Sequence, residues 1–239
     1  SVRWNNVTRS YLMSVDHSLK IGDESALRVR IIFNLHILCG IYGRSLHVPK
    51  EIITQLDYIF KPKSIAVIGA SNSPGKWGYR MTNTPLTTGY RGPIYPVNPT
   101  EKTVCGLPAY ANVKDIPGDV DMAVMVAPAQ FVPQAMRDCV AKGIKGVVMI
   151  TAGFAETGAE GKALQDEVVR IAQEGGIRFV GPNGMGIYSS AVNLSLSFDD
   201  VPKKGKIAFV SQSGTFGGML ARMANAKGYG LSKFVSIGN

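Results

Sequence analysis

The sequence predicts an α/β protein with a doubly wound parallel sheet, followed by the start of a second, incomplete α/β domain. Short, nearly continuous apolar runs recur from about Lys61, helical patterns separate them, and a polar, turn-rich stretch near Pro202 precedes a second strand–turn–helix pattern. Such runs are typical of strands that are buried on both faces. Their alternation with helices indicates βαβ units with right-handed crossovers.

Five runs of the first domain are expected to be strands, because they are short and rich in Val, Ile and Met. They are SIAVI (64–68), GPIYPV (92–97), VDMAVMV (120–126), GVVMIT (146–151) and IRFVG (177–181). Beyond the polar stretch, KIAFV (206–210) and SKFVSIG (232–238) predict two further strands on either side of a helix.

Helices are expected over residues 131–143, 159–175 and about 214–227. The first two place apolar side chains on one face and end at glycine; these side chains are Val132, Met136, Cys139 and Val140, then Leu164, Val168, Ile171 and Ala172. Spacings of three and four residues are the signature of an amphipathic helix, and a glycine after the last apolar position is a common stop.

We divide the chain into an unassigned segment (1–54), a first domain (55–201) and the incomplete beginning of a second domain (202–239). Residues 1–50 show neither a clean period nor clear caps. The last segment, roughly 37 residues, is too short to bury a core of its own. It is expected to pack on the first domain, on another chain or on polypeptide absent here. Its unfinished sheet leaves an edge open to a partner, so we expect an oligomer.

Composition narrows the classes of partner. The net charge of +9 is dispersed and forms no Lys/Arg block, so nucleic acid is not expected. No run approaches the ~20 apolar residues of a membrane span. Cys39, Cys105 and Cys139 form no CxxC pair, which argues against a disulfide framework and against a metal site. A reducing, cytoplasmic location fits best.

The stretch IAVIGASNSPGKWG (65–78) predicts a strand that runs into a glycine-rich, phosphate-binding turn. A nucleotide P-loop needs GxxxxGK followed by Ser or Thr. Here five residues separate Gly69 from Gly75, and Trp77 follows Lys76. The loop is one residue too long and lacks the hydroxyl that binds magnesium. This turn therefore does not fit the P-loop pattern.

A dinucleotide site prefers GxGxxG and an acidic residue at the end of the second strand. Ser71 stands at the second glycine position, the second strand ends at Asn98, and the nearest acid is Glu101. Coenzyme A needs N–H donors, a helix N-terminus and cations, but no carboxylate. Gly69, Ser71, Gly75 and Lys76, with Lys102 beyond the second strand, fit that need, and a purely structural turn is the remaining alternative.

The order of several motifs resembles the NDP-forming (ADP-forming) acyl-CoA synthetases, which are similar to the α subunit of succinyl-CoA synthetase. The resemblance runs from about Leu56 to Asn239 through LDYIFKPKSIAVIGAS, PGKWG, GPIYPVNP, VCGLPAY, DIPGDVDMAVMVAPA, GVVMITAGFAETG, GIRFVGPNGMGI and IAFVSQSGTFG. It implies a Rossmann-like CoA-binding domain followed by the start of a flavodoxin-like domain.

The resemblance also implies where CoA lies, across the carboxyl ends of the first domain's strands. The residues it places there are Gly69, Ala70, Ser71, Lys76, Asn98, Pro99, Lys102, Ala127, Pro128, Thr151, Ala152, Gly153 and Asn183. Gly184 stands where the family usually has cysteine, which implies an altered pocket wall. Asn183 is expected either to bind the ligand or to cap its turn.

In the second domain, SQSGT corresponds to the family's turn into a helix. That helix N-terminus is implied to receive the phosphate of a phosphohistidine, through Ser211, Ser213, Gly214 and Thr215; an ordinary helix cap is the alternative. The family's histidine follows the SGN-like segment, here SIGN (236–239), whereas His17, His36 and His47 all precede the matched region.

We therefore expect the CoA-binding portion of a ligase that interconverts acyl-CoA, phosphate and ADP with acid, CoA and ATP. Its partners are CoA or acyl-CoA and an ATP-grasp domain or β subunit, which would supply ATP, ADP and Mg. The chain alone is expected to be inactive and to contain no catalytic residue. A stand-alone CoA-binding regulatory module and an NAD(P)-binding oxidoreductase domain remain as alternatives.

Overall fold

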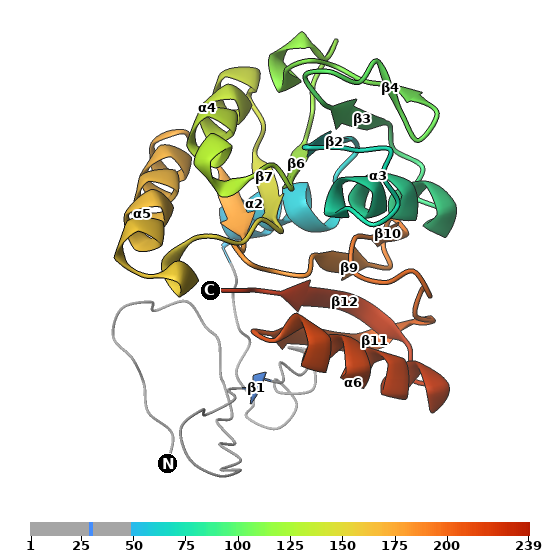
Figure 1. The fold of residues 1–239 in the computed structure, drawn as a ribbon. Coiled ribbons are helices and arrows are strands. Elements are labelled where there is room, and N and C mark those ends of the chain that lie inside the picture. The colour runs from blue at the N-terminus through green and yellow to red at the C-terminus, as the bar shows by residue number, and fades with distance from the viewer. Residues whose placement is uncertain (1–28, 31–48) are drawn as a thin grey trace.

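The structure, a computed structural model, describes residues 29–30 and 49–239 (Figure 1). Most of the segment 1–54, with all three histidines and Cys39, therefore lies outside the described residues. Helix α2 (Lys50–Phe60) begins before residue 55, where the first domain was expected to start. The amphipathic α2 packs against the first sheet and belongs with it.

The first sheet has five parallel strands in the order β3-β2-β6-β7-β8. They are β2 (Ile65–Ile68), β3 (Ile94–Val97), β6 (Met122–Met125), β7 (Gly146–Met149) and β8 (Arg178–Val180). All five apolar runs predicted as strands are confirmed. By position along the chain the order is 2-1-3-4-5, so the winding direction reverses between β2 and β6.

The helices of this domain are α3 (Trp77–Thr88), α4 (Val132–Lys142) and α5 (Ala159–Glu174), with 3-10 turns η1 (Val113–Asp115), η2 (Ala129–Phe131) and η3 (Ala155–Thr157). Two helices match the predicted spans, and α4 ends at Gly143, whose φ of 82° suits glycine. No helix among residues 29–30 and 49–239 is long and apolar enough to cross a membrane.

Alternate residues of each strand enter two different cores, as strand geometry requires. On one face, Ala66 and Ile68 pack with α4 and α5. On the other face, Ile65 and Val67 pack with α2, α3 and the second sheet. Figure 1 shows α4 and α5 together on one side of the strands, with the second sheet on another side. Both faces are covered, which explains why these strands are apolar throughout.

The second sheet has the order β1-β11-β12-β9-β10. Its strands are β1 (Val29–Arg30), β9 (Ile187–Ser189), β10 (Leu194–Ser195), β11 (Lys204–Ser211) and β12 (Leu231–Ser236), and α6 (Gly214–Ala226) packs on β11 and β12. The parallel pair β11–β12 and the helix between them confirm the predicted second strand–helix–strand unit. A separate hairpin joins β4 (Thr103–Val104) to β5 (Leu107–Pro108).

The sheet pairing departs from the expected domain boundary near Pro202. Strands β9 and β10 precede that residue, yet β9 pairs with β12, with Ile187 opposite Val235. Leu196, which follows β10, is fully buried in the core that β2 and β6 share with the second sheet. The sequence did not indicate β9 and β10, because they are short and contain buried serines.

Because this core is shared, we predict that the described parts of the two sheets unfold together. Leu196→Ala is expected to cost about 2–5 kcal/mol, the usual range for a buried Leu. Ile53→Ala is the control, since this α2 side chain is 46% exposed and its loss should change stability by less than about 0.5 kcal/mol. Urea unfolding followed by circular dichroism and fluorescence measures both; two separate transitions, with only the later one shifted, would contradict the prediction.

Candidate functional site

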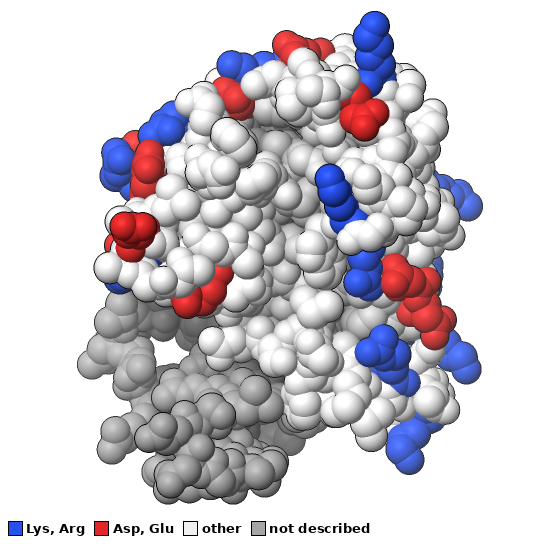
Figure 2. Space-filling model, viewed as in Figure 1, with Lys and Arg blue, Asp and Glu red and all other residues white. Residues whose placement is uncertain are grey.

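Two adjoining cavities lie at the carboxyl ends of the first sheet's strands. The larger, of about 900 Å³, opens between the loops that follow β2, β3 and β6. The smaller, of about 320 Å³, continues toward the loop after β7. Their walls share Trp77, Val126, Ala127 and Pro128. In Figure 2 the middle of this face is hollowed and carries few charged side chains. The cavities thus occupy the place where α/β sheets usually bind ligands.

The glycine-rich loop is shaped by two close backbone approaches. Gly69 has a φ of 94°, and a Cβ there would lie 2.7 Å from the Ala127 nitrogen. A Cβ on Gly78 would lie 2.2 Å from the Gly69 carbonyl oxygen. Gly75 has open space around it. Gly78 therefore supplies the close helix–strand packing that the last glycine of such a loop provides, a role that the sequence reasoning did not give it.

The same loop shows which N–H groups can reach a ligand. The N–H groups of Gly69 and Ala70 both donate to the Val97 carbonyl, at 3.0 and 3.2 Å, so neither is free to bind a phosphate. At the start of α3, the N–H groups of Trp77 and Gly78 have no acceptor among the described residues, as expected for a first helical turn. No side chain caps this helix, and its N-cap residue, Lys76, lines the larger cavity. The free donors and the helix dipole favour an anion here.

Two asparagines hold the loops around the larger cavity. Asn98 donates to the Ala70 carbonyl and accepts from the N–H groups of Thr100 and Glu101, so its amide braces β3's loop against the glycine-rich loop. Asn72 donates to the Thr103 carbonyl and accepts from the Cys105 N–H. Asn98 was expected near the nucleotide end of CoA, and it does line the cavity. Its amide is nevertheless engaged in bracing.

A polar cluster that the sequence reasoning missed lies at the far end of the larger cavity. Asp138 is 8% exposed and accepts from Asn112 Nδ2 at 2.8 Å and from Gln134 Nε2 at 3.1 Å. Lys114 Nζ lies 3.0 Å from its Oδ1. Burial raises the pKa of Asp138, but these hydrogen bonds and the Lys114 charge outweigh it, so the pKa lies below its ordinary value. A buried carboxylate on an apolar helix face was the available signal.

Besides the shared Ala127 and Pro128, three residues implied by the resemblance line the smaller cavity: Thr151, Ala152 and Asn183. The Thr151 hydroxyl donates to the Ala127 carbonyl at 2.8 Å, which ties the loops after β6 and β7 together. Asn183 has a φ of 58° and donates to Asn239 Oδ1, so both of its expected roles stay open. Gly184 also lines this cavity, where a Cβ would lie 2.7 Å from the Ser236 carbonyl oxygen.

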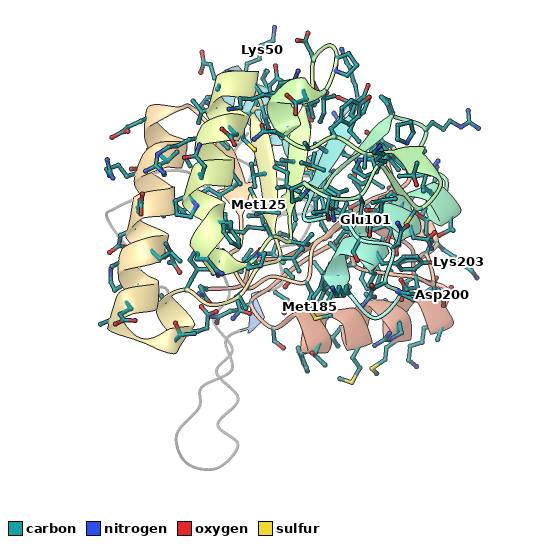
Figure 3. All side chains as sticks on the ribbon, turned by 45° about the horizontal axis from the view of Figure 1, so that its top comes forward. Lys50, Glu101, Met125, Met185, Asp200 and Lys203 are labelled. Carbon is teal, nitrogen blue, oxygen red and sulfur yellow. The ribbon has the colours of Figure 1, made fainter. Side chains whose placement is uncertain are left out.

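Met185 connects the smaller cavity with the start of α6. It lines that cavity, a Cβ on Gly214 would lie 2.4 Å from its Cγ, and the Thr215 hydroxyl lies 3.9 Å from its sulfur. Figure 3 shows Met185 beside one end of α6. Ser213 accepts from the Phe216 N–H and so caps the helix, while the Ser211 hydroxyl donates to the Ser213 carbonyl. Both serine side chains are thus engaged within the protein.

The structure brings most of the sequence-predicted residues into one continuous site. Eleven line the two cavities: Gly69, Ala70, Ser71, Lys76, Asn98, Pro99, Ala127, Pro128, Thr151, Ala152 and Asn183. Lys102 and Gly153 line neither cavity, and the Gly153 N–H is taken by Glu156 at 2.5 Å. Ser211, Ser213, Gly214 and Thr215, at the end of β11 and the start of α6, line neither cavity, and Gly214 and Thr215 lie against Met185, which lines the smaller one. Their part in binding stays a prediction.

Comparison with known proteins places this geometry in a family. The family described as CoA binding domain matches residues 63–190, and the one described as succinyl-CoA ligase like flavodoxin domain matches residues 204–239. The chain belongs to the CoA binding domain family, whose match covers more than half of its length. This confirms the resemblance of the motifs, the Rossmann-like first domain and the beginning of a flavodoxin-like second domain.

Curated relatives agree with this placement. The α subunit of ADP-forming acetate–CoA ligase II from Pyrococcus furiosus is 50% identical over 184 residues, which cover 77% of this chain and 40% of that protein. The ADP-forming 4-hydroxybutyrate–CoA ligase of Nitrosopumilus maritimus is 42% identical over 184 residues, 76% of this chain and 26% of that protein. The chain thus spans well under half the length of these relatives.

Solved structures share the fold. A Pyrococcus horikoshii OT3 protein matches with a TM-score of 0.73 and 49% identity, over 77% of this chain and 42% of that one. The dinucleotide forming acetyl-coenzyme A synthetase 1 of Ca. Korarchaeum cryptofilum, solved with phosphate and ADP, matches with a TM-score of 0.72 and 38% identity, over 77% and 39%.

We predict that Gly78→Ala destabilises the protein by about 1–3 kcal/mol, the usual cost of overpacking, although alanine favours helices. The reason is the 2.2 Å approach of its Cβ to the Gly69 carbonyl. The matched change Gly75→Ala meets nothing within 4 Å and should alter stability by less than about 1 kcal/mol. Thermal unfolding of both variants checks this; equal losses would show that the loop, rather than the close approach, is sensitive.

The lowered pKa of Asp138 predicts a pH dependence of stability. A carboxylate with a depressed folded-state pKa contributes fully above its unfolded value, near 3.9, and loses that contribution as the pH falls through the folded value. Asp138→Asn should therefore cost about 1–3 kcal/mol at pH 7, and its difference from wild type should shrink below about pH 4. Urea unfolding from pH 3 to 7 tests it; a constant difference would contradict the linkage.

Proposed function

We propose that the two joined cavities bind CoA and that the chain acts as the CoA-binding portion of an ADP-forming acyl-CoA synthetase. The observation that carries this is that the two cavities meet at Trp77, the first residue of the uncapped helix α3, and that the smaller one extends to Met185 beside α6. A long ligand with phosphates at one end and a reactive group at the other fits this arrangement.

The phosphate end of CoA would lie against the first turn of α3. There the free N–H groups of Trp77 and Gly78, the helix dipole and the Lys76 side chain favour negative charge. The second strand, β3, ends without an acid, since Asn98 follows it. That arrangement suits CoA better than a nicotinamide dinucleotide, whose ribose hydroxyls need an acidic partner.

The pantetheine arm would pass Ala127 and Pro128 into the smaller cavity and place its thiol near Met185. In the direction that forms acyl-CoA, the thiol sulfur would bond to the carbonyl carbon of an acyl phosphate, the bond from that carbon to the phosphate oxygen would break, and inorganic phosphate would leave with the proton that the thiol gives up. The start of α6, with the N–H groups of Gly214 and Thr215 at its tip, adjoins this end. Anions are stabilised at such a position, which supports a role in docking a phosphohistidine.

The remaining chemistry would come from other polypeptide. A phosphohistidine and an ATP-grasp domain or β subunit, with Mg and ATP or ADP, would complete the ligase, and assembly into an oligomer would bring them to α6. The chain alone would bind CoA without turnover. ATP formation from acetyl-CoA, phosphate and ADP by the purified chain alone would contradict this division of roles.

Calorimetric titration with CoA tests the binding proposal, with NADH and ATP as controls. Ser71→Glu is expected to weaken CoA binding at least about tenfold, because it adds negative charge beside the phosphate end in the larger cavity. Ser73→Glu is the matched control, since Ser73 belongs to the same loop but lines neither cavity. Binding should also weaken as salt rises. Saturable NADH binding with no CoA binding would overturn the proposal.

A further inference from the structure

The far end of the larger cavity carries a second pattern on α4 and the turn before it. Phe131, Gln134, Ala135 and Asp138 line the cavity at positions i, i+3, i+4 and i+7, which is one face of a helix. Val113 lines it as well, and Phe131 is 59% exposed. This part of the cavity therefore combines apolar walls with one polar cluster, and it lies on the α4 side of the sheet, whereas α3 packs on the other face.

Asp138 fixes the orientation of the Gln134 amide. A carboxylate has only acceptors, so the group that faces it must be the amide nitrogen, which lies 3.1 Å from Asp138 Oδ1. The depressed pKa keeps Asp138 ionised at neutral pH. Asn112 and Lys114 hold the carboxylate from other sides, at 2.8 and 3.0 Å. The Gln134 amide thus cannot turn over without placing oxygen against oxygen.

The consequence is a single acceptor presented by an oriented side chain. With Nε2 engaged, Gln134 Oε1 is left to accept, and the described residues offer it no donor. Gln134 lines the cavity and is exposed to it. Among flat groups that fit between apolar walls, an aromatic base with an exocyclic amine supplies the matching donor. A base with an oxygen at that position would place this acceptor against Gln134 Oε1, which is also an acceptor.

We propose that Gln134, oriented by Asp138, determines specificity for adenine by accepting a hydrogen bond from its 6-amino group. This inference rests on the proposed CoA site and assigns its base-binding end. CoA also carries donors in its ribose and in the hydroxyl and amide groups of its pantetheine arm. The walls formed by Val113, Phe131 and Ala135 suit an aromatic face better than a sugar, and the proposed site places the pantetheine arm in the smaller cavity. Asp138 acts through Gln134 and is a positioning residue.

The test compares two probes that differ only in the base, adenosine 3′,5′-bisphosphate and inosine 3′,5′-bisphosphate, by titration into the purified chain, with CoA as reference. Wild type should bind the adenosine compound about tenfold more tightly, the value of one well-placed hydrogen bond. Gln134→Met removes the acceptor at similar size and should reduce that preference to less than about twofold.

Asp138→Asn provides a second readout that a purely structural residue would not change. The new amide can donate to Gln134 Oε1, which lets the Gln134 amide turn and present its NH₂ group. The preference for adenosine should then fall or reverse toward inosine. Arg137→Met is the control, because Arg137 lies on the same helix, pairs with Glu167 at 2.6 Å and does not line the cavity.

The possible outcomes separate this inference from the proposed function. If CoA and both bisphosphates bind, but with equal affinity for the two bases, the role of Gln134 is overturned and the CoA site stands. An unchanged preference in both variants, each shown to be folded by circular dichroism, also overturns it. If a folded wild-type chain binds neither CoA nor either bisphosphate, both proposals fail.

Discussion

The contact of three backbone segments at residues 69, 78 and 127 is the constraint on which the site depends. The chain leaves β2 at Gly69, α3 enters at Gly78, and the loop after β6 passes at Ala127, all within distances that exclude a Cβ at either glycine. Interiors are packed closely enough that such a contact fixes relative positions. Because the contact lies where the winding direction of the sheet reverses, it fixes both the position of the first turn of α3 and the place where the two cavities meet.

Several polar side chains of the site hydrogen-bond loops to one another and so hold the loops in place, whereas other polar groups face the cavity. Asn72 and Asn98 are engaged in joining loops, and Thr151 ties together the loops after β6 and β7. Among the described residues, the groups that can face a ligand in the larger cavity include the backbone N–H groups at the start of α3, the Lys76 side chain and the Gln134 amide. A site whose loops are already ordered loses little entropy when a ligand enters. The geometry is therefore suited to a ligand that is flexible before it binds.

The sequence predicted the first sheet well because each strand is buried on both faces and leaves an uninterrupted apolar run. It predicted most of the cavity for a related reason, since the residues after such strands share one edge of the sheet. Prediction from the sequence failed where the spacing of apolar residues says little about the structure. Strands β9 and β10 contain serines whose burial depends on distant partners, and the N–H groups of Gly69 and Ala70 are occupied by Val97, which only the folded register shows.

The polar cluster was missed for a different reason. Asp138 and Gln134 lie on a helix whose apolar stripe accounts for its packing, and nothing local shows that Asn112 and Lys114 approach from another part of the chain. Side-chain networks of this kind depend on contacts between residues far apart in sequence. They are visible once η1 and α4 are placed side by side, as the structure places them.

The pairing of β9 with β12 bears on how such chains can be recombined. A chimera joined at Pro202 would give β9 a foreign partner strand and would ask Ile187 and Leu196 to fit a core selected for another sequence. A junction placed before Gly186, in the loop after β8, would carry β9, β10 and β12 together, but it would separate Ile187 and Leu196 from β2, β6 and α3, with which they share a core. Modular exchange in this architecture is therefore constrained by the shared core as well as by strand pairing, and neither junction leaves both intact.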